Sequence, residues 1–190
     1  MKEDYGFVEK MCTRRIFLEF GIAAALTGLF PVNSFSSLTK FSLPERSLSF
    51  YNIHTDERLR AVYWHKGLYV SETLDEINYI MRDFRTEEVH PINPQLLDLL
   101  YEIHNRLETR QSFHIVSGYR SPKTNNYLYR RSKGVSKNSL HMYGMAVDVR
   151  VPRCDLKNLY TIVKSLKKGG VGYYPESDFV HTDVGEIRWW

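Results

Sequence analysis

The sequence contains few cysteines and lacks a long apolar run, and each shortage excludes a class of protein. Only Cys12 and Cys154 occur in 190 residues, which is too few for a disulfide framework. The clearest apolar stretch, Phe20–Val32, has 13 residues, fewer than the ~20 that a membrane-spanning helix needs. Internal repeats and low-complexity tracts are also lacking, so the chain is not collagen-like, coiled-coil or mainly disordered.

The charge of the chain is basic but evenly spread. Its net charge is +4, and no block rich in lysine and arginine of the nucleic-acid-binding type occurs, so we expect no nucleic-acid partner. With 43% hydrophobic and 25% charged residues the composition is that of a globular protein, and the length suits one domain.

Residues 1–37 are typical of an export signal. A polar start leads to Arg14 and Arg15, an apolar stretch follows, and a Ser/Asn-rich segment ends the region. Paired arginines in this position are typical of the twin-arginine route. No small-x-small cleavage site stands out, so an uncleaved anchor remains an alternative, and that anchor would be the only contact with a membrane. A buried helix is a third interpretation, in which Arg14 and Arg15 would need partners.

Residues 38–190 are the expected working domain. The first 37 residues carry four basic and four acidic side chains, so this domain keeps the whole charge of +4. It also keeps a single cysteine, Cys154, and therefore depends on its hydrophobic core for stability. Localisation in the periplasm and a monomeric state are expected.

Alternating and helical patterns divide this domain into short elements. Strands are expected at Leu48–His54, Leu59–Trp64, Phe113–Ser117, Met145–Val151, Val171–Tyr174 and Phe179–Val184. Four helices are expected. The first has Ser71 as its N-cap, the third runs from Ser121 to Arg131, and the fourth runs from Leu156 to a stop at Gly169-Gly170. The second begins at Pro94 and has an apolar stripe of five residues: Leu96, Leu97, Leu100, Ile103 and Leu107. This pattern predicts an α+β fold with a small antiparallel sheet and flanking helices.

Two histidines and one aspartate stand apart from the other candidates. Asp148 lies inside the apolar strand pattern AVDVRV, where a carboxylate is costly to bury unless it is paired or bound to metal. His141 precedes it at a loop end, and His181 lies in a late strand. Two imidazoles and a carboxylate leave a fourth tetrahedral position for water, as in catalytic zinc sites. The remaining histidines are expected to be structural or solvated: His54, His65, His90, His104 and His114.

Three motifs in order resemble those of the zinc D,D-peptidases. They are His141-x6-Asp148, Ser117-Gly118-Tyr119-Arg120-Ser121 and Phe179-Val180-His181-x-Asp183. That superfamily includes D-alanyl-D-alanine carboxypeptidases, VanX-type dipeptidases and the Hedgehog zinc domain. A more particular resemblance is to the MepK (YcbK-like) murein endopeptidases, on Asn52-x-His54-Thr55 and the segment Gly169–Pro175.

The resemblance implies a Hedgehog/D,D-peptidase-like fold and one zinc ion per chain, held by His141, Asp148 and His181. It implies that Arg120 stabilises the oxyanion, a role that suits a permanently charged guanidinium. For the general base it offers two residues. Asp183 shares a strand face with His181 and is favoured, and Asp178, three positions before His181, is the runner-up. Asp183 could instead be a partner that orients a ligand.

The function expected from this resemblance is that of an exported zinc endopeptidase that cuts peptidoglycan peptide cross-links at bonds containing D-amino acids. Two alternatives stay open: a D,D-carboxypeptidase that trims stem peptides, and a zinc-stabilised cell-wall-binding module without turnover. Cys154 as a nucleophile is a weaker interpretation, because no sequence feature pairs it with a histidine.

Overall fold

A computed structural model describes residues 45–132 and 134–190. The predicted export segment, residues 1–37, and Cys12 lie outside these described residues. Among the helices that the structure describes, none is long and apolar enough to cross a bilayer.

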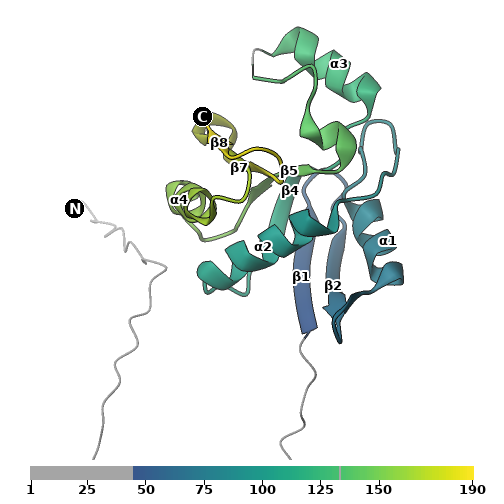
Figure 1. Cartoon of the computed structure of the whole chain (residues 1–190). Helices are drawn as coiled ribbons and strands as arrows, with labels where there is room; N and C mark the ends of the chain where they lie inside the picture. Colours follow the sequence, from purple (N-terminus) through teal and green to yellow (C-terminus); the bar gives the residue numbers. More distant parts are fainter. Residues whose placement is uncertain (1–44, 133) are drawn as a thin grey trace, which may run out of the picture. The chain divides into compact units, whose positions relative to one another are not determined.

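One sheet of eight strands forms the centre of the described part, in the order β3-β2-β1-β4-β5-β7-β6-β8 (Figure 1). The strands are β1 (Glu45–Asn52), β2 (Arg58–His65), β3 (Leu68–Tyr69), β4 (Phe113–Ser117), β5 (Ala146–Arg150), β6 (Gly170–Tyr174), β7 (Phe179–Asp183) and β8 (Arg188–Trp189). The sheet is larger than expected and mixed, since β1 pairs with β4 and β6 with β8 in parallel while the other neighbours are antiparallel. Two helices lie between β1 and β4 in the chain, and such a long crossover permits the parallel pairing.

In the described residues, four α-helices and two short 3-10 turns accompany the sheet. The helices are α1 (Ser71–Ile80), α2 (Pro94–Arg106), α3 (Pro122–Arg131) and α4 (Leu156–Leu166), and the turns are η1 (Leu140–Tyr143) and η2 (Pro175–Ser177). The starts of α2 and α3 follow from their sequences, because Asn93 and Ser121 cap them and a proline occupies the first turn of each. The architecture of residues 45–190, apart from position 133, is therefore mixed, with one sheet and four α-helices.

Two predicted helix boundaries are wrong. Ser71 is the first residue of α1 rather than its cap, and the side chain of the actual N-cap, Val70, makes no capping hydrogen bond. Helix α4 ends at Leu166, where Lys167 adopts the left-handed conformation with φ of 53°. Gly170 is instead the first residue of β6, and Gly169 lies just before it, where a Cβ would overlap the carbonyl oxygen of Asp183.

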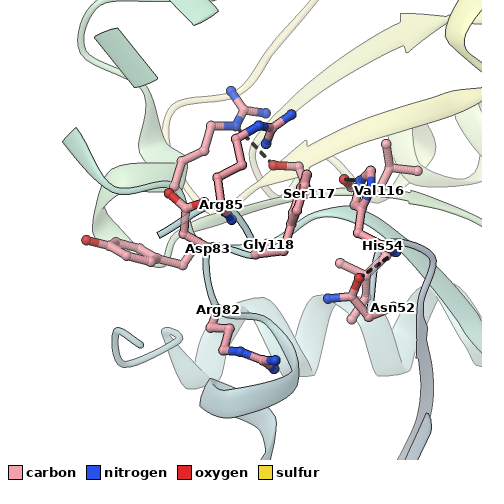
Figure 2. Close-up of a pocket in the computed structure, with 12 residues that line it drawn as sticks. Asn52, His54, Arg82, Asp83, Arg85, Val116, Ser117 and Gly118 are labelled. Atoms are coloured by element: carbon pink, nitrogen blue, oxygen red, sulfur yellow. Dashed lines mark hydrogen bonds between the residues drawn. The ribbon is translucent and has the colours of Figure 1, made fainter. Parts of the chain in front are cut away.

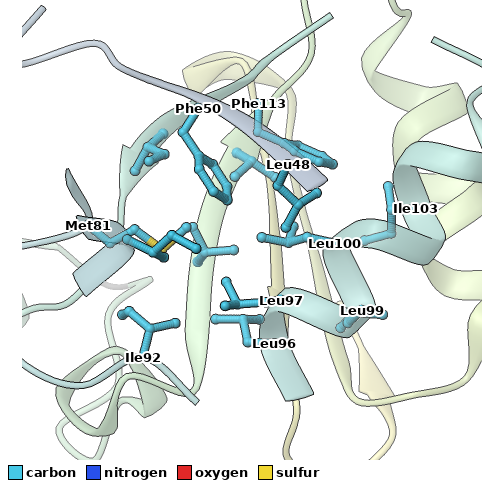
Figure 3. Close-up of a cluster of buried hydrophobic side chains, with 14 of the residues drawn as sticks. Leu48, Phe50, Met81, Ile92, Leu96, Leu97, Leu99, Leu100, Ile103 and Phe113 are labelled. Atoms are coloured by element: carbon cyan, nitrogen blue, oxygen red, sulfur yellow. The ribbon is translucent and has the colours of Figure 1, made fainter. Parts of the chain in front are cut away.

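The part of the hydrophobic core shown in Figure 3 lies between the first strands and helix α2, and the same core continues to Leu159 and Val163 of α4. The predicted stripe of α2 is confirmed, because all five of its residues are buried: Leu96, Leu97, Leu100, Ile103 and Leu107. They pack with Leu48 and Phe50 of β1, Phe113 of β4 and Met81 after α1. This core fixes β4 beside β1 and so positions the residues that follow β4, which belong to the candidate site.

Candidate metal centre

Strand pairing brings Asp148 and His181 together. Asp148 on β5 lies directly opposite His181 on the antiparallel strand β7, so both side chains project from the same face of the sheet. His141 belongs to η1, whose start is capped by the Ser139 hydroxyl and whose C-cap is Gly144 at φ of 63°. A Cβ on Gly144 would overlap the carbonyl oxygen of Pro91, so glycine is required where the chain turns from η1 into β5.

The three predicted metal-binding side chains form one buried cluster. His181 Nδ1 lies 2.8 Å from Asp148 Oδ1, and His141 Nε2 lies 3.2 Å from both Asp148 Oδ1 and His181 Nδ1. With bonds of about 2.0–2.1 Å, the ligand atoms of a tetrahedral zinc site lie roughly 3.3 Å apart. The spacing of these three atoms therefore suits one zinc ion.

Hydrogen bonds behind both imidazoles set which nitrogen faces the cluster. Nδ1 of His141 donates to the carbonyl oxygen of Gly118 at 2.7 Å, and Nε2 of His181 donates to Asp183 Oδ2 at 3.1 Å. In the neutral rings, the nitrogens that face Asp148 then carry lone pairs. Three electron-rich atoms that converge in this way repel one another unless a cation lies among them. The donor set therefore fits a divalent metal ion.

The buried charges of the cluster also favour a cation at this place. Burial lowers the pKa of His141 and so favours its neutral, ligating form. Burial also opposes charge on His181, but hydrogen bonds to Asp148 and Asp183 outweigh it and raise the pKa of His181 to about 9, so that without a metal ion this ring carries a proton, which a bound metal would displace. Burial would raise the pKa of Asp148, yet interactions with His141 and His181 hold it far below its usual range. Asp148 and Asp183 thus favour positive charge at this place, in part from the adjacent Arg120 and Arg188 and in part from a proton or a metal ion at the histidines.

Arg120 lies at the cluster and is bound to one of its members. Its Nη2 donates to Asp148 Oδ2 at 2.7 Å and its Nε to the Ser117 hydroxyl at 3.0 Å. Asp148 therefore presents Oδ1 to the two histidines and Oδ2 to the arginine. The guanidinium holds the carboxylate in place and adds positive charge beside the cluster.

The two candidate bases occupy different places. Asp183 is fully buried behind His181 and also accepts hydrogen bonds from the backbone of Gly170 and Gly185 and from Arg188. Burial would raise its pKa, but the hydrogen bonds from His181 and the two amides lower it to about 2. Asp178 is exposed and pairs with Arg150 at 2.9 Å.

A cavity of about 720 Å³ opens beside the cluster, and we call it the site cavity. His141, Asp148 and His181 line it, together with Arg120, whereas Asp178, Asp183 and Cys154 do not. An aromatic wall formed by Tyr174, Phe179 and Trp190 lies on one side: Tyr174 stacks on Phe179, and Trp190 Nε1 donates to the Tyr174 hydroxyl. A volume of this size accommodates a short peptide.

The site cavity includes residues that sequence reasoning missed. His54, expected to be structural or solvated, lines the cavity. The stretch Asn52-x-His54-Thr55, which resembles the MepK murein endopeptidases, is the signal that could have identified it. Arg85 and Arg188 line the cavity too, without any motif to mark them. Figure 2 shows an adjoining recess, around which His54, Arg85 and Ser117 are drawn.

The fold and site together define a mixed α/β protein with a buried His-Asp-His cluster, suited to one metal ion, in the wall of a peptide-sized cavity. A family model described as "Peptidoglycan L,D-endopeptidase MepK" matches residues 40–190, and the chain belongs to this family.

Curated relatives agree with this membership. The peptidoglycan L,D-endopeptidase MepK of Escherichia coli strain K12 is 39% identical over 178 residues, which cover 93% of this chain and 96% of the relative. A probable peptidoglycan L,D-endopeptidase MepK of Haemophilus influenzae is 38% identical over 93% of this chain and 95% of its own length.

Proposed function

We propose that this protein is an exported, zinc-dependent endopeptidase that hydrolyses peptide cross-links of peptidoglycan. The observation that carries the proposal is the buried convergence of His141, Asp148 and His181 in the wall of a peptide-sized cavity. Membership of the MepK family supports peptidoglycan as the substrate, and the names of its relatives favour an L,D-bond.

His141, Asp148 and His181 would hold the zinc ion, with Gly118 and Asp183 fixing the two rings from behind. Bound zinc would lower the pKa of a coordinated water toward about 7 and polarise the scissile carbonyl. The chain's own contribution is to hold these ligands rigidly in a buried site, where electrostatic effects are stronger than in water.

Arg120 is proposed to stabilise the negative charge that grows on the carbonyl oxygen. Two of its N–H groups bind Asp148 and Ser117, which leaves three of the five donors of the guanidinium for a substrate in the cavity. Because Asp148 and Ser117 already hold the side chain, its charge is in position before the reaction begins.

Asp183 is proposed to position His181 rather than to remove a proton from water. Its carboxylate is fully buried, is not part of the cavity wall, and accepts hydrogen bonds from His181, two backbone amides and Arg188. A general base must reach the proton that it takes, directly or through one water. Asp178 also lies outside the cavity wall, and its ion pair with Arg150 engages it elsewhere.

Export is proposed for the same protein because its proposed substrate lies outside the cytoplasmic membrane. Residues 1–37, with Arg14 and Arg15, would direct the chain to the periplasm by the twin-arginine route. Changing both residues to lysine should leave the precursor in the cytoplasm, as measured by fractionation. Normal export of that variant would contradict the route.

Digestion of defined muropeptides tests the proposed activity. The zinc-loaded protein is incubated with an L,D-cross-linked dimer, a D,D-cross-linked dimer and an uncross-linked pentapeptide, and the products are identified by mass spectrometry. The L,D-dimer should yield monomers while the pentapeptide stays intact. Release of only the terminal residue would show a carboxypeptidase, and tight zinc binding without any product would show a binding module.

A further inference from the structure

Among the residues that the structure describes, three arginines line the site cavity, and they differ in their partners. Arg120 is bound to Asp148, and Arg188 to Asp183 at 2.7 Å. Arg85 is exposed and has no acidic partner among the described residues. A guanidinium at a cavity wall that no carboxylate neutralises is a site for an anion.

Two acidic neighbours of Arg85 in the chain, Asp83 and Glu87, are engaged by other groups, and the third, Glu88, forms no ion pair with it. The two oxygens of Asp83 accept hydrogen bonds from the backbone amides of Arg85 and Ser121. Glu87 pairs with Arg82 at 2.7 Å, and Glu57 pairs with the same guanidinium. Arg82 is therefore a buried structural arginine. The guanidinium of Arg85, three positions later, forms no ion pair within the described part of the chain and can contact a ligand in the site cavity.

An aromatic ring supports the Arg85 side chain. The guanidinium carbon lies 4.2 Å from the centre of the Phe84 ring, which also stacks on His54 with ring centres 3.8 Å apart. The Nε2 atom of His54 is in turn 2.9 Å from the Val116 carbonyl oxygen. Stacking limits the motion of the guanidinium, so that less conformational entropy is lost when it binds a ligand. Figure 2 shows His54, Arg85 and Val116 in this recess.

We propose that Arg85 binds a free carboxylate of the substrate peptide and thereby selects that peptide and orients it for cleavage. This inference rests on the proposed function, because stem peptides of peptidoglycan supply such carboxylates within reach of a scissile bond. A planar guanidinium can bind both oxygens of a carboxylate at once, which neither a lysine nor a hydroxyl group can do.

The test compares substrates that differ by a single carboxylate. Three L,D-cross-linked muropeptides are used: one with all carboxylates free, one with the diamino-acid side-chain carboxylate amidated, and one with the chain-terminal carboxylates amidated. Full-length zinc-loaded wild type, Arg85→Ala and Arg85→Lys are compared by kcat/KM. Arg58→Ala is the matched control, since Arg58 is also exposed and stacked, 4.1 Å from the Tyr51 ring centre, but lies outside the cavity wall.

The losses in kcat/KM from amidation and from Arg85→Ala are expected to be non-additive. With the wild type, amidation of one of the two carboxylate types should lower kcat/KM by about 10- to 100-fold, and Arg85→Ala should lower it equally for the free substrate. For the amidated substrate, Arg85→Ala should cause no further loss. Arg85→Lys should recover part of the activity, and Arg58→Ala should behave as wild type.

Two results would overturn the inference while leaving the proposed function intact. One is wild-type protein that cleaves all three substrates equally well, and the other is an Arg85→Ala loss of the same size on free and on both amidated substrates. Failure of the proposed function would look different, because the wild type would then cleave none of the three.

Discussion

The Asp183 carboxylate lies 3.1 Å from Nε2 of His181, on the side of the ring opposite to the nitrogen that faces Asp148. The two residues lie on one face of β7, and the carboxylate is buried while His181 lines the cavity. Such a carboxylate fixes the tautomer and orientation of a metal-binding histidine.

Asp183→Asn should therefore weaken zinc binding by about 10- to 100-fold. The amide cannot supply the negative charge that supports His181, so the metal should be lost first and turnover should largely return at saturating zinc. Zinc affinity from chelator competition, with kcat measured at saturating zinc, checks this. Unchanged zinc affinity with a lost kcat would instead identify Asp183 as the base. Asp178→Asn, at an exposed ion pair, is the control and should change neither quantity.

Arg120→Ala should lower kcat by roughly 100-fold or more, the usual loss when a preorganised donor is removed from a developing oxyanion. It should also weaken zinc binding, because Asp148 loses its 2.7 Å partner. Arg120→Lys keeps the charge but cannot bind Asp148 and Ser117 in the same fork, so an intermediate kcat is expected. Wild-type kcat in Arg120→Ala would show that this guanidinium has no part in the reaction.

Asp83→Asn should destabilise the protein in a pH-dependent manner. Burial would raise the pKa of Asp83, but hydrogen bonds from Thr124, Ser121 and the Arg85 amide lower it below its usual value. A carboxyl group whose pKa is lower in the folded state stabilises the protein above its unfolded pKa, near 3.9, and this stabilisation is lost as the pH falls through the folded pKa.

Urea unfolding should therefore show Asp83→Asn to be less stable than wild type by about 1–3 kcal/mol at pH 7, with the difference shrinking below pH 4. Glu76→Gln, at an exposed position on α1, should have little effect at any pH. A difference that grows on acidification would contradict the assignment.

Leu97→Ala should cost about 2–5 kcal/mol of unfolding free energy, because the side chain is fully buried where α2 meets the sheet. Leu68→Ala is the matched control, since that leucine on β3 is 73% exposed and should change stability by no more than about 0.5 kcal/mol. Equal losses for the two variants in urea unfolding would contradict the position of the core.

Local sequence patterns predict much of this fold. Strands β5 and β7 are recognisable because apolar residues flank Asp148 and His181, and α2 and α3 because a capping residue and a proline begin each. Strands β3 and β8 are two residues long, too short for any period to show. The end of α4 depends on Lys167 adopting a conformation that a propensity argument assigns to glycine.

The candidate site divides in the same way. His141, Asp148 and His181 are predictable from residue type and motif, whereas their convergence depends on the β5–β7 register and on η1. That register places Asp148 opposite His181, and Asp183, two residues further along β7, lies on the other side of the His181 ring. Among residues 45–132 and 134–190, Arg85 lacks an acidic partner because Glu57 and Glu87 pair with Arg82 instead. Such long-range pairing leaves no local signal in the sequence.

The measurement that tests the central claim most directly is a zinc titration of the chelated protein with an L,D-cross-linked muropeptide as substrate. Activity should rise with added zinc and saturate at one ion per chain, and His141→Ala should give no product at any zinc concentration that saturates the wild type. Full activity in the chelated protein, or in His141→Ala, would contradict the account.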